Sequence, residues 1–445
     1  MKINRLRSAW ITVLGVAGAL PVFAMPIDEA VSAALASDQR LAAGESMIAS
    51  GEASVTQARS AYLPTVTLDA AVRRQDEAYT FIQPAIAIPL GPPIGVIGVP
   101  ESELELFGRD TAIGEISVNQ LLYVGGRRAA GMSQARSGVA LARAAQAQTR
   151  RTVRAEVEQL YIQRWHAENV ITVAEKTKGL MTALRSLTDA LLEGGSTSLT
   201  RKDALRAALA EEKLIGIEAQ VRAGFDMATR MLAQRTGQEI PPKLQDPTQL
   251  LSTYASAEAN GLITQHPQLE QLRLAADIAG AQADEARGAR LPVVRLSAGF
   301  QTFDNNLGAG LDNSSNQESW RIGIEIRVPI FDGGSARARV SRALSERRGR
   351  EEQRAYAIDA LQAQYEALRA AIARQQSQLD ATQRAVTLAR QLESLTRRSA
   401  GQDQEAIQEQ IETTVYLALA EVDHLNAKRD YLLALSGMQS LLGTP

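Results

Sequence analysis

At 445 residues, with 48 basic and 50 acidic side chains, the chain has a formal net charge of −2. This near balance gives no electrostatic reason to expect a nucleic-acid partner. Cysteine is absent and only three histidines occur, which excludes disulfides, thiol catalysis and most zinc or haem sites. Aromatic residues make up 4% of the chain, a low value for a globular enzyme and one compatible with long helices.

Residues 1–24 have the features of a secretory signal peptide. Basic residues between Lys2 and Arg7 precede an apolar run over residues 9–20, and the small residue Ala24 supplies a cleavage site. The apolar run is too short to cross a bilayer, which argues against the alternative of a membrane-anchored N-terminus. We therefore expect an exported protein without transmembrane helices, and the lack of cysteine excludes a lipoprotein.

The rest of the chain is duplicated. The segment 58–64 (ARSAYLP) returns as 286–292 (ARGARLP), and 123–127 (YVGGR) returns as 331–335 (FDGGS). The shift between the copies is about 228 residues at the Leu-Pro pair and about 208 at the Gly-Gly pair. The first copy therefore contains an additional segment of about twenty residues between these two landmarks.

The first repeat is expected to span residues 25–240. A helix over residues 28–61 leads into a pair of strands at 62–77 and 112–124, and a hairpin of two long helices follows over 128–237.

A linker at 241–257 separates this unit from the second repeat, residues 258–445. The second repeat has the same order of elements, and we expect its helix, strand pair and helical hairpin at 258–290, at 291–304 with 319–331, and at 336–443.

Both hairpins are expected to consist of very long helices. No proline occurs from Glu101 to Ile240 or from Ile330 to Thr444, and proline inside a helix costs about 3 kcal/mol. A helix over residues 128–192 would be about 97 Å long, which indicates a coiled coil. Apolar side chains at alternating steps of three and four support this in the second copy: Ile358, Leu361, Tyr365, Leu368, Ile372, Leu379 and Val386.

Four segments alternate apolar and polar side chains, as strands do. The clearest is residues 320–330, in which isoleucines alternate with Arg321, Glu325 and Arg327, and Glu115 occupies the polar side of the corresponding strand in the first copy. Strands with one apolar and one charged face are typical of a membrane β-barrel wall. The alternative is an antiparallel sheet in a soluble domain. The export signal and the long helices favour the barrel.

Four strands cannot close a barrel, and an open sheet edge finds no partner in lipid. Two copies would give eight strands and a filled interior, whereas three would give twelve strands and can leave a lumen. The charged inner face favours the second arrangement. The expected fold class is mainly α with membrane β: an internally duplicated chain with long coiled-coil hairpins, whose four strands contribute to a trimeric twelve-stranded barrel.

The export signal, the duplicated Leu-Pro strand start, the strand ends at 123–126 and 331–334 and the two hairpins together resemble the TolC family of outer-membrane efflux proteins. The closing stretch, residues 425–444, is especially similar. The resemblance implies a homotrimer whose barrel contacts the lipid of the bacterial outer membrane and whose helices extend as a tunnel into the periplasm. It also implies contact with a periplasmic adaptor (membrane fusion) protein and an inner-membrane pump of the RND or ABC type, and no cofactor or metal.

In that family the hairpin tips contact the adaptor. The resemblance places the tips at glycine-containing bends, where helices end readily. The residues expected to contact the adaptor are Gly194, Gly195, Ser196, Thr197, Gly401 and Gln402.

An acidic residue after each bend narrows the periplasmic entrance in that family and favours cations. The resemblance places these residues at Asp203, Glu409 and Glu412, and the internal repeat relates Asp203 to Glu409 by a shift of about 206. The chain departs from the family at Glu405, where a basic gate residue is common, so we expect like-charge repulsion at the entrance rather than an Arg–Asp lock. Ordinary solvated acids on a helix are the simpler interpretation.

The additional segment of the first copy lies at residues 79–110, and the resemblance implies that it faces the outside of the cell. It is apolar and rich in Pro and Gly. We expect a loop, because proline cannot continue a strand ladder. It could constrict the outer mouth or serve as a receptor site, but we favour packing against the loops of neighbouring protomers.

We therefore expect the exit duct of a tripartite efflux system that carries small molecules. Type I protein secretion is the alternative, and a periplasmic structural or adaptor coiled coil is the alternative from another class. An adaptor would carry one hairpin between soluble β domains, whereas this chain has two hairpins and strands with an isoleucine-lined face. An enzyme is not expected, because His166, His266 and His424 are scattered and no nucleophile motif or phosphate loop occurs.

Overall fold

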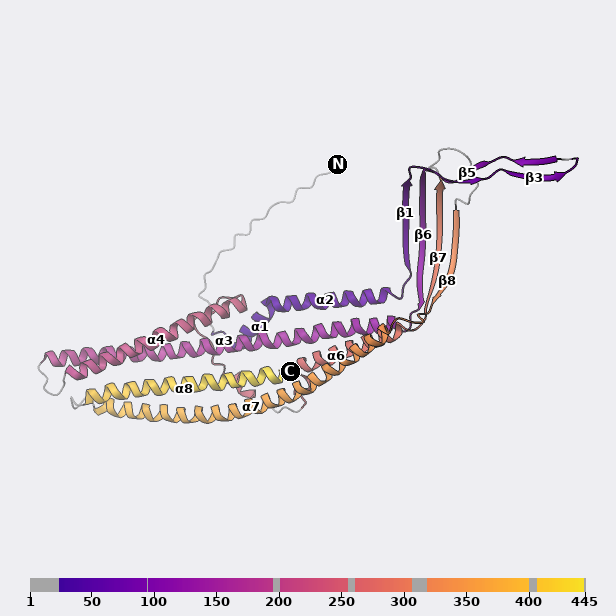
Figure 1. Cartoon of the computed structure of the whole chain (residues 1–445). Coiled ribbons are helices and arrows are strands. Elements are labelled where there is room, and N and C mark those ends of the chain that lie inside the picture. The colour runs from indigo at the N-terminus through magenta and orange to yellow at the C-terminus, as the bar shows by residue number, and fades with distance from the viewer. Residues whose placement is uncertain are drawn as a thin grey trace, which may run out of the picture. The chain divides into compact units, whose positions relative to one another are not determined.

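The computed structural model describes residues 24–93, 95–194, 201–254, 261–305, 318–399 and 406–443. One order of elements occurs twice along the chain (Figure 1). In the first copy the elements are α1 (Ile27–Ser37), α2 (Gln39–Ser60), β1 (Thr65–Arg74), β6 (Asp110–Tyr123), α3 (Arg127–Glu193) and α4 (Arg201–Thr236). In the second copy they are α6 (Pro267–Gly288), β7 (Val293–Asn305), β8 (Glu318–Arg327), α7 (Ser335–Ser399) and α8 (Ala406–Leu442). The expected long helical hairpins and four strands are confirmed.

Two shorter groups of elements interrupt this order. The linker between the copies contains α5 (Thr248–Leu251) and a 3-10 helix (Ser252–Tyr254). A second 3-10 helix (Ile263–Gln265) precedes α6, so the helix expected over residues 258–290 begins only at Pro267. The additional segment of the first copy contains β2 (Tyr79–Gln83), β3 (Ile86–Gly91), β4 (Gly95–Val99) and β5 (Ser102–Phe107). Among the helices within the described ranges, none combines the length and the apolarity needed to cross a membrane.

The chain divides into two compact units, and each draws on both repeats. Unit 1 comprises the described parts of Met1–Leu41, Thr149–Ile263 and Ala360–Pro445, and therefore holds α1, α4, α8 and the greater part of α3. Unit 2 comprises Ala42–Gln148 and Thr264–Asp359, and holds the strands, α6 and most of α2.

The four long strands of unit 2 form one antiparallel sheet in the order β1-β6-β7-β8 (Figure 1). The pairing register of β1 with β6 is repeated between β7 and β8. Leu68 of β1 lies opposite Ile116 of β6, and their repeat partners, Leu296 of β7 and Ile324 of β8, also lie opposite each other. Among the described residues, the two outer strands of this sheet, β1 and β8, each have one unpaired edge.

Two glycines allow the end of β6 to approach the end of α6 in unit 2. Gly125 has a φ of +65°, and a Cβ atom there would lie 2.4 Å from the carbonyl oxygen of Gly288. A Cβ atom on Gly288 would in turn lie 2.3 Å from the carbonyl oxygen of Gly125. Because both obstacles are backbone atoms, neither position accepts a side chain without moving the chain.

Buried polar side chains of α3 tie the parts of unit 1 together. Arg164, whose side chain is 1% exposed, donates from Nε to Thr229 Oγ1 at 2.7 Å and from Nη2 to the carbonyl oxygen of Pro242 at 3.0 Å. Its guanidinium also stacks 3.6 Å from the ring centroid of Phe225. One turn earlier, the Tyr161 hydroxyl lies 2.6 Å from the carbonyl oxygen of Met25, and burial raises its pKa. α3 therefore anchors α4, the linker and the start of the described chain.

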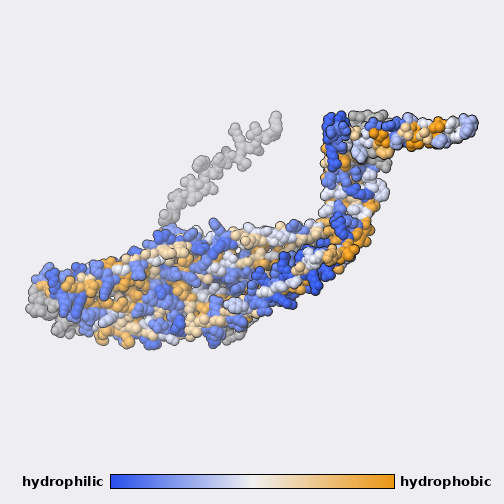
Figure 2. Space-filling model, in the orientation of Figure 1, coloured by the Kyte–Doolittle hydropathy of each residue, from blue (hydrophilic) through white to orange (hydrophobic). Residues whose placement is uncertain are grey.

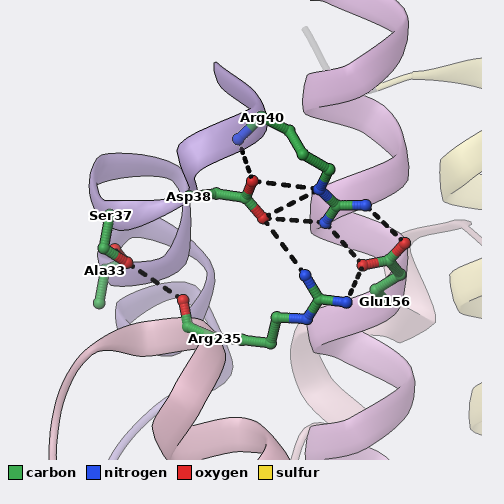
Figure 3. A network of polar contacts seen from close by, with 6 residues as sticks. All are labelled: Ala33, Ser37, Asp38, Arg40, Glu156 and Arg235. Atoms are coloured by element: carbon green, nitrogen blue, oxygen red, sulfur yellow. Dashed lines mark hydrogen bonds and ion pairs between the residues drawn. The ribbon is translucent and has the colours of Figure 1, made fainter. Parts of the chain in front are cut away.

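An ion-pair network holds the junction of α1 and α2 against α3 and α4 in unit 1 (Figure 3). Asp38 caps α2, since its Oδ1 accepts the backbone N–H of Arg40 at 2.8 Å. The Arg40 guanidinium binds Asp38 at 2.8 Å and Glu156 at 2.7 Å, and Arg235 binds Glu156 at 3.3 Å. Hydrogen bonds from Arg40 lower the pKa of Asp38 and of Glu156. Their stabilisation is therefore present above the ordinary carboxyl pKa and is lost as the pH falls through the lowered values. The single helix expected over residues 28–61 is thus broken at Asp38.

Replacing Arg40 with methionine is expected to lower the free energy of unfolding by about 1–3 kcal/mol, because it leaves the buried Asp38 carboxylate without its main partner. Arg273→Met is the matched control. Arg273 also binds two carboxylates, Glu270 and Asp277, but all three side chains are about half exposed, and such pairs contribute at most about 1 kcal/mol. Urea unfolding of the purified protein in detergent measures both, and equal losses would contradict this role for the network.

Candidate functional site

The sheet of unit 2 has one continuous apolar face. Rows of directly opposed residues run across all four strands, and one row consists of Leu68, Ile116, Phe300 and Trp320. On β8 the apolar side chains of Trp320, Ile322, Ile324 and Ile326 are 65–76% exposed. No element described in the chain covers them, and a face of this size requires an apolar environment.

The opposite face of the same sheet carries the residues predicted to line the lumen. Glu115, Arg321, Glu325 and Arg327 all lie on it, as the pairings of β6, β7 and β8 show. Arg321 of β8 forms an ion pair with Glu115 of β6 across the intervening strand β7. Glu325 binds Arg327 at 2.9 Å and lies 3.8 Å from Arg295 of β7.

Gly299 makes the ion pair between Arg321 and Glu115 possible. This glycine was not among the residues predicted from the sequence. Gly299 lies opposite Arg321, and the position of its missing Cβ is 3.4 Å from Arg321 Nε and 3.5 Å from Glu115 Oε1. A larger side chain would therefore meet the arginine where it crosses β7. The signal in the sequence is a glycine on the polar side of a strand, which marks a close approach by another group.

The additional segment is a β-ribbon, and the prediction of a loop is wrong. β2 pairs with β5 and β3 pairs with β4, and Pro89 itself lies opposite Val96. Proline fits because alternate residues of a two-stranded ribbon point their N–H away from the partner strand. Ile86 and Ile88 face Val99 and Ile97 across the ribbon, and all four side chains are 36–52% exposed. Figure 2 shows orange, apolar surface along this ribbon. A constricting, receptor or packing role for the ribbon stays a prediction.

The structure describes part of the predicted acidic entrance. Glu409 and Glu412 lie one turn apart on the exposed side of α8, and the spacing of three and four continues along this side with Tyr416 and Leu419. Asp203 lies in the first turn of α4, and Glu405 lies outside the described residues.

Of the predicted tip residues, the structure describes Gly194. It follows α3, and its N–H donates to the carbonyl oxygen of Ala190 at 3.0 Å. The other predicted tip residues lie outside the described part of the chain: Gly195, Ser196, Thr197, Gly401 and Gln402.

Near the end of α7 the usual distribution of polar and apolar side chains is reversed. The predicted seven-residue seam is buried at Leu361, Ile372 and Val386, and its continuation places Glu393 and Thr396 inside at 6% and 3% exposure. Three leucines point outward instead, with exposures of 45–66%: Leu388, Leu392 and Leu395. An exposed row of leucines beside a buried polar seam is typical of a contact surface.

A second apolar surface lies between α3, α4 and α8 in unit 1. A cavity of about 360 Å³ is lined by Val173 of α3, by Leu209, Leu214 and Ile217 of α4, and by Leu419 of α8, among others. Leu209 and Leu419 are 58% and 47% exposed. The basic side chains of Arg206 and Lys213 also line it, so the cavity offers apolar contact with cationic groups on the same α4 helix.

Two of the three histidines are half-buried in unit 1. His166 lies 2.9 Å from Asn426 Oδ1, and His424 Nδ1 lies 3.2 Å from Thr382 Oγ1. Burial lowers the pKa of both imidazoles. Within the described residues no group of three His, Cys, Asp or Glu side chains is placed to hold a metal ion.

The lowered histidine pKa values predict a loss of stability in mild acid. Above the ordinary histidine pKa both imidazoles are neutral in the folded and in the unfolded protein. As the pH decreases below that value, the unfolded chain binds protons first, so the free energy of unfolding decreases. The double variant His166→Gln with His424→Gln is expected to lose less stability than the parent between pH 7.5 and 5.5, which are chosen to bracket the ordinary value of about 6.5. Melting curves across this range measure the slopes, and parallel slopes would contradict the prediction.

The comparisons with known proteins agree with this geometry. The family model described as outer membrane efflux protein matches residues 30–223 and 260–444. TolC of Escherichia coli is 25% identical over 52% of this chain and 50% of TolC, and BepC of Brucella suis is 26% identical over 62% of this chain and 59% of BepC. The chain thus aligns with about half the length of these curated relatives.

Solved structures match over a longer part of the chain. The open-state MtrE outer membrane channel of Neisseria gonorrhoeae has a TM-score of 0.74 at 17% identity, over 94% of this chain and 88% of MtrE. VceC of Vibrio cholerae has a TM-score of 0.72 at 15% identity, over 94% and 96%. At these identities the likeness shows the fold alone. The family model, which matches most of the chain, shows that the protein belongs to the outer membrane efflux protein family and resides in the outer membrane.

Proposed function

We propose that the protein is the outer-membrane exit duct of a tripartite efflux system. The observation that carries the proposal is the sheet, with one apolar face, one charged face and two unpaired edges. Three copies would close twelve strands into a barrel with lipid outside and a water-filled lumen inside. The long hairpins of α3 with α4 and α7 with α8 would continue the duct into the periplasm.

The exposed apolar surfaces of the hairpins support a role in assembly with other proteins. The leucine row of α7 and the cavity beside Leu209 and Leu419 are suited to apolar side chains of a second helical protein. We assign these surfaces to a periplasmic adaptor and to neighbouring copies of this chain. The adaptor would connect the duct to an inner-membrane pump.

The acidic residues of α8 are proposed to set the ion preference of the periplasmic entrance. The double variant Glu409→Gln with Glu412→Gln removes two charges per copy without shortening either side chain. It is expected to reduce cation selectivity and block by divalent cations in planar bilayers, because carboxylates concentrate cations at a narrow entrance. Glu421→Gln is the control, because Glu421 is held by Arg390 at 2.8 Å. Unchanged selectivity in the double variant would contradict the assignment.

The proposed function is tested by deleting the chromosomal copy and complementing it. Small-molecule efflux predicts that the deletion strain accumulates more of a fluorescent efflux substrate and becomes sensitive to several compounds, with an unchanged culture-medium proteome. Loss of one large protein from the medium would instead assign the duct to type I secretion. Normal accumulation, sensitivity and medium together would contradict an exit duct.

A further inference from the structure

The two unpaired edges of the sheet, β1 and β8, are where one copy of the chain would pair with the next. We propose that β8 of one copy pairs antiparallel with β1 of a second copy in a single register, in which Arg327 lies opposite Asp69 of the partner subunit and forms an ion pair with it. This inference rests on the barrel proposed above and specifies its seam.

The internal repeat supplies the register. The shifts of about 228 residues for β1 onto β7 and about 208 for β6 onto β8 come from the Leu-Pro and Gly-Gly landmarks. Applied to the β1–β6 pairing, they convert Val66 opposite Val118 into Val294 opposite Ile326, which is the pairing that the structure has. The repeat therefore transfers strand registers correctly where this can be checked.

The same shifts convert the β6–β7 pairing into the seam between copies. Asn119 lies opposite Ser297 in β6–β7, and this pair becomes Arg327 opposite the partner's Asp69. Ser117 opposite Gly299 becomes Glu325 opposite the partner's Ala71. On the other face, Val118 opposite Ala298 becomes Ile326 opposite the partner's Ala70. Across the seam, Ile326 thus meets an apolar residue and Arg327 meets a residue of opposite charge.

The charges on the polar face favour this register. Asp69 lies opposite Glu115 in its own sheet, and its side chain forms no hydrogen bond or ion pair with the described residues. Arg327 binds Glu325 and its side chain remains 75% exposed. The seam gives both groups an opposite charge directly across the strands, which is favourable in a sheet. A shift of two residues in one direction would place Glu325 opposite the partner's Asp69, and a shift of one residue would turn the isoleucines of β8 into the lumen.

The length of β8 is consistent with a missing neighbour. β6, paired on both sides, continues to Tyr123, whereas β8 ends at Arg327, although the repeat partner of Tyr123 is Phe331. Ile330 and Phe331 are 96% and 88% exposed. Pairing with β1 of the next copy would extend β8 over these residues.

Cysteine cross-linking tests the register directly, because the chain contains no cysteine. Ala71→Cys with Glu325→Cys is expected to give disulfide-linked oligomers up to the trimer in outer membranes. Directly opposed residues lie within about 5.5 Å, which a disulfide can bridge. The positive control is a directly opposed pair on the same face within one chain, Asn119→Cys with Ser297→Cys, which should form an intrachain disulfide. Thr67→Cys with Glu325→Cys is four residues out of register and should link about tenfold less.

Charge exchange tests the ion pair. Asp69→Arg and Arg327→Asp are each expected to reduce the trimer that resists SDS, and the double exchange is expected to restore it. Preferential linkage of Ala71→Cys with Gly323→Cys or Arg327→Cys, in a protein that still forms trimers, would overturn the register and leave the proposed function standing. A parent protein that forms no oligomer in the outer membrane would overturn both.

Discussion

Replacing Ile324 with arginine is expected to abolish accumulation of the protein in the outer membrane. Ile324 lies near the middle of β8 on the apolar face, is 66% exposed and faces Leu296 of the neighbouring strand. An arginine on the lipid-facing side of a barrel costs about 2–4 kcal/mol at the bilayer midplane, and a trimer would bear this cost three times. Outer-membrane fractionation and SDS gels of unheated samples measure the loss of trimer.

Ser297→Arg is the matched control for this substitution. Ser297 lies opposite Gly323, one position away from the pair of Leu296 and Ile324, but on the polar face. An arginine there would point into water beside residues that are already charged, so normal accumulation is expected. If Ser297→Arg failed to assemble and Ile324→Arg assembled normally, the assignment of the two faces to lumen and lipid would be reversed.

Gly125→Ala is expected to be the most disruptive substitution of a single small residue. The new methyl group would lie 2.4 Å from the carbonyl oxygen of Gly288 and 2.7 Å from Leu291 Cβ. The left-handed backbone at φ +65° adds a further cost of about 1–2 kcal/mol for any residue with a Cβ. Since the backbone of α6 would have to move, we expect loss of folded protein, measured as trimer yield and protease resistance.

Gly333→Ala separates the effect of the steric contact with α6 from the effect of the left-handed backbone conformation. Gly333 is the repeat partner of Gly125 and has the same φ of +65°, but apart from its own chain neighbours no atom of the described residues lies within 4 Å of the added methyl group. This variant should show only the backbone cost of about 1–2 kcal/mol and should still assemble. Equal defects in the two variants would show that the backbone conformation, rather than the contact with α6, is decisive.

Most of the fold was predictable because its elements are long and regular. The alternation at residues 320–330 and the proline-free stretches each repeat one signal many times, and β8 and the helices of the hairpins follow from it. The positions of Glu115 and Arg321 on the polar face of the sheet were predictable for the same reason. The internal repeat adds a second, independent reading of each element, which is why the register of the sheet can be transferred from one strand pair to another.

The features that the sequence did not reveal depend on contacts between distant residues. The break at Asp38 is stabilised by Glu156 and Arg235, which lie far along the chain, and the local sequence around Asp38 shows only an ordinary cap residue. The ribbon at residues 79–107 was missed because proline was taken to exclude strand pairing. Proline lacks an N–H group, so it is excluded only at positions where that N–H would point toward the partner strand.

The outward leucines of α7 illustrate a further limit. A seven-residue pattern predicts which side of a helix is buried, but Leu388, Leu392 and Leu395 lie off that pattern and are exposed in the chain. The role of these exposed leucines depends on the surface that they contact, which the sequence of this chain alone does not identify.

Modification of single cysteines in planar bilayers tests most directly whether the sheet is the wall of a trimeric, water-filled pore. Gln301→Cys places a thiol on the polar face of β7, and Phe300→Cys places one on the apolar face at the neighbouring position. We expect an ion-conducting protein in which a charged thiol reagent lowers the current of Gln301→Cys in three steps and leaves that of Phe300→Cys unchanged. Absence of conductance, or block through Phe300→Cys alone, would contradict the proposed duct.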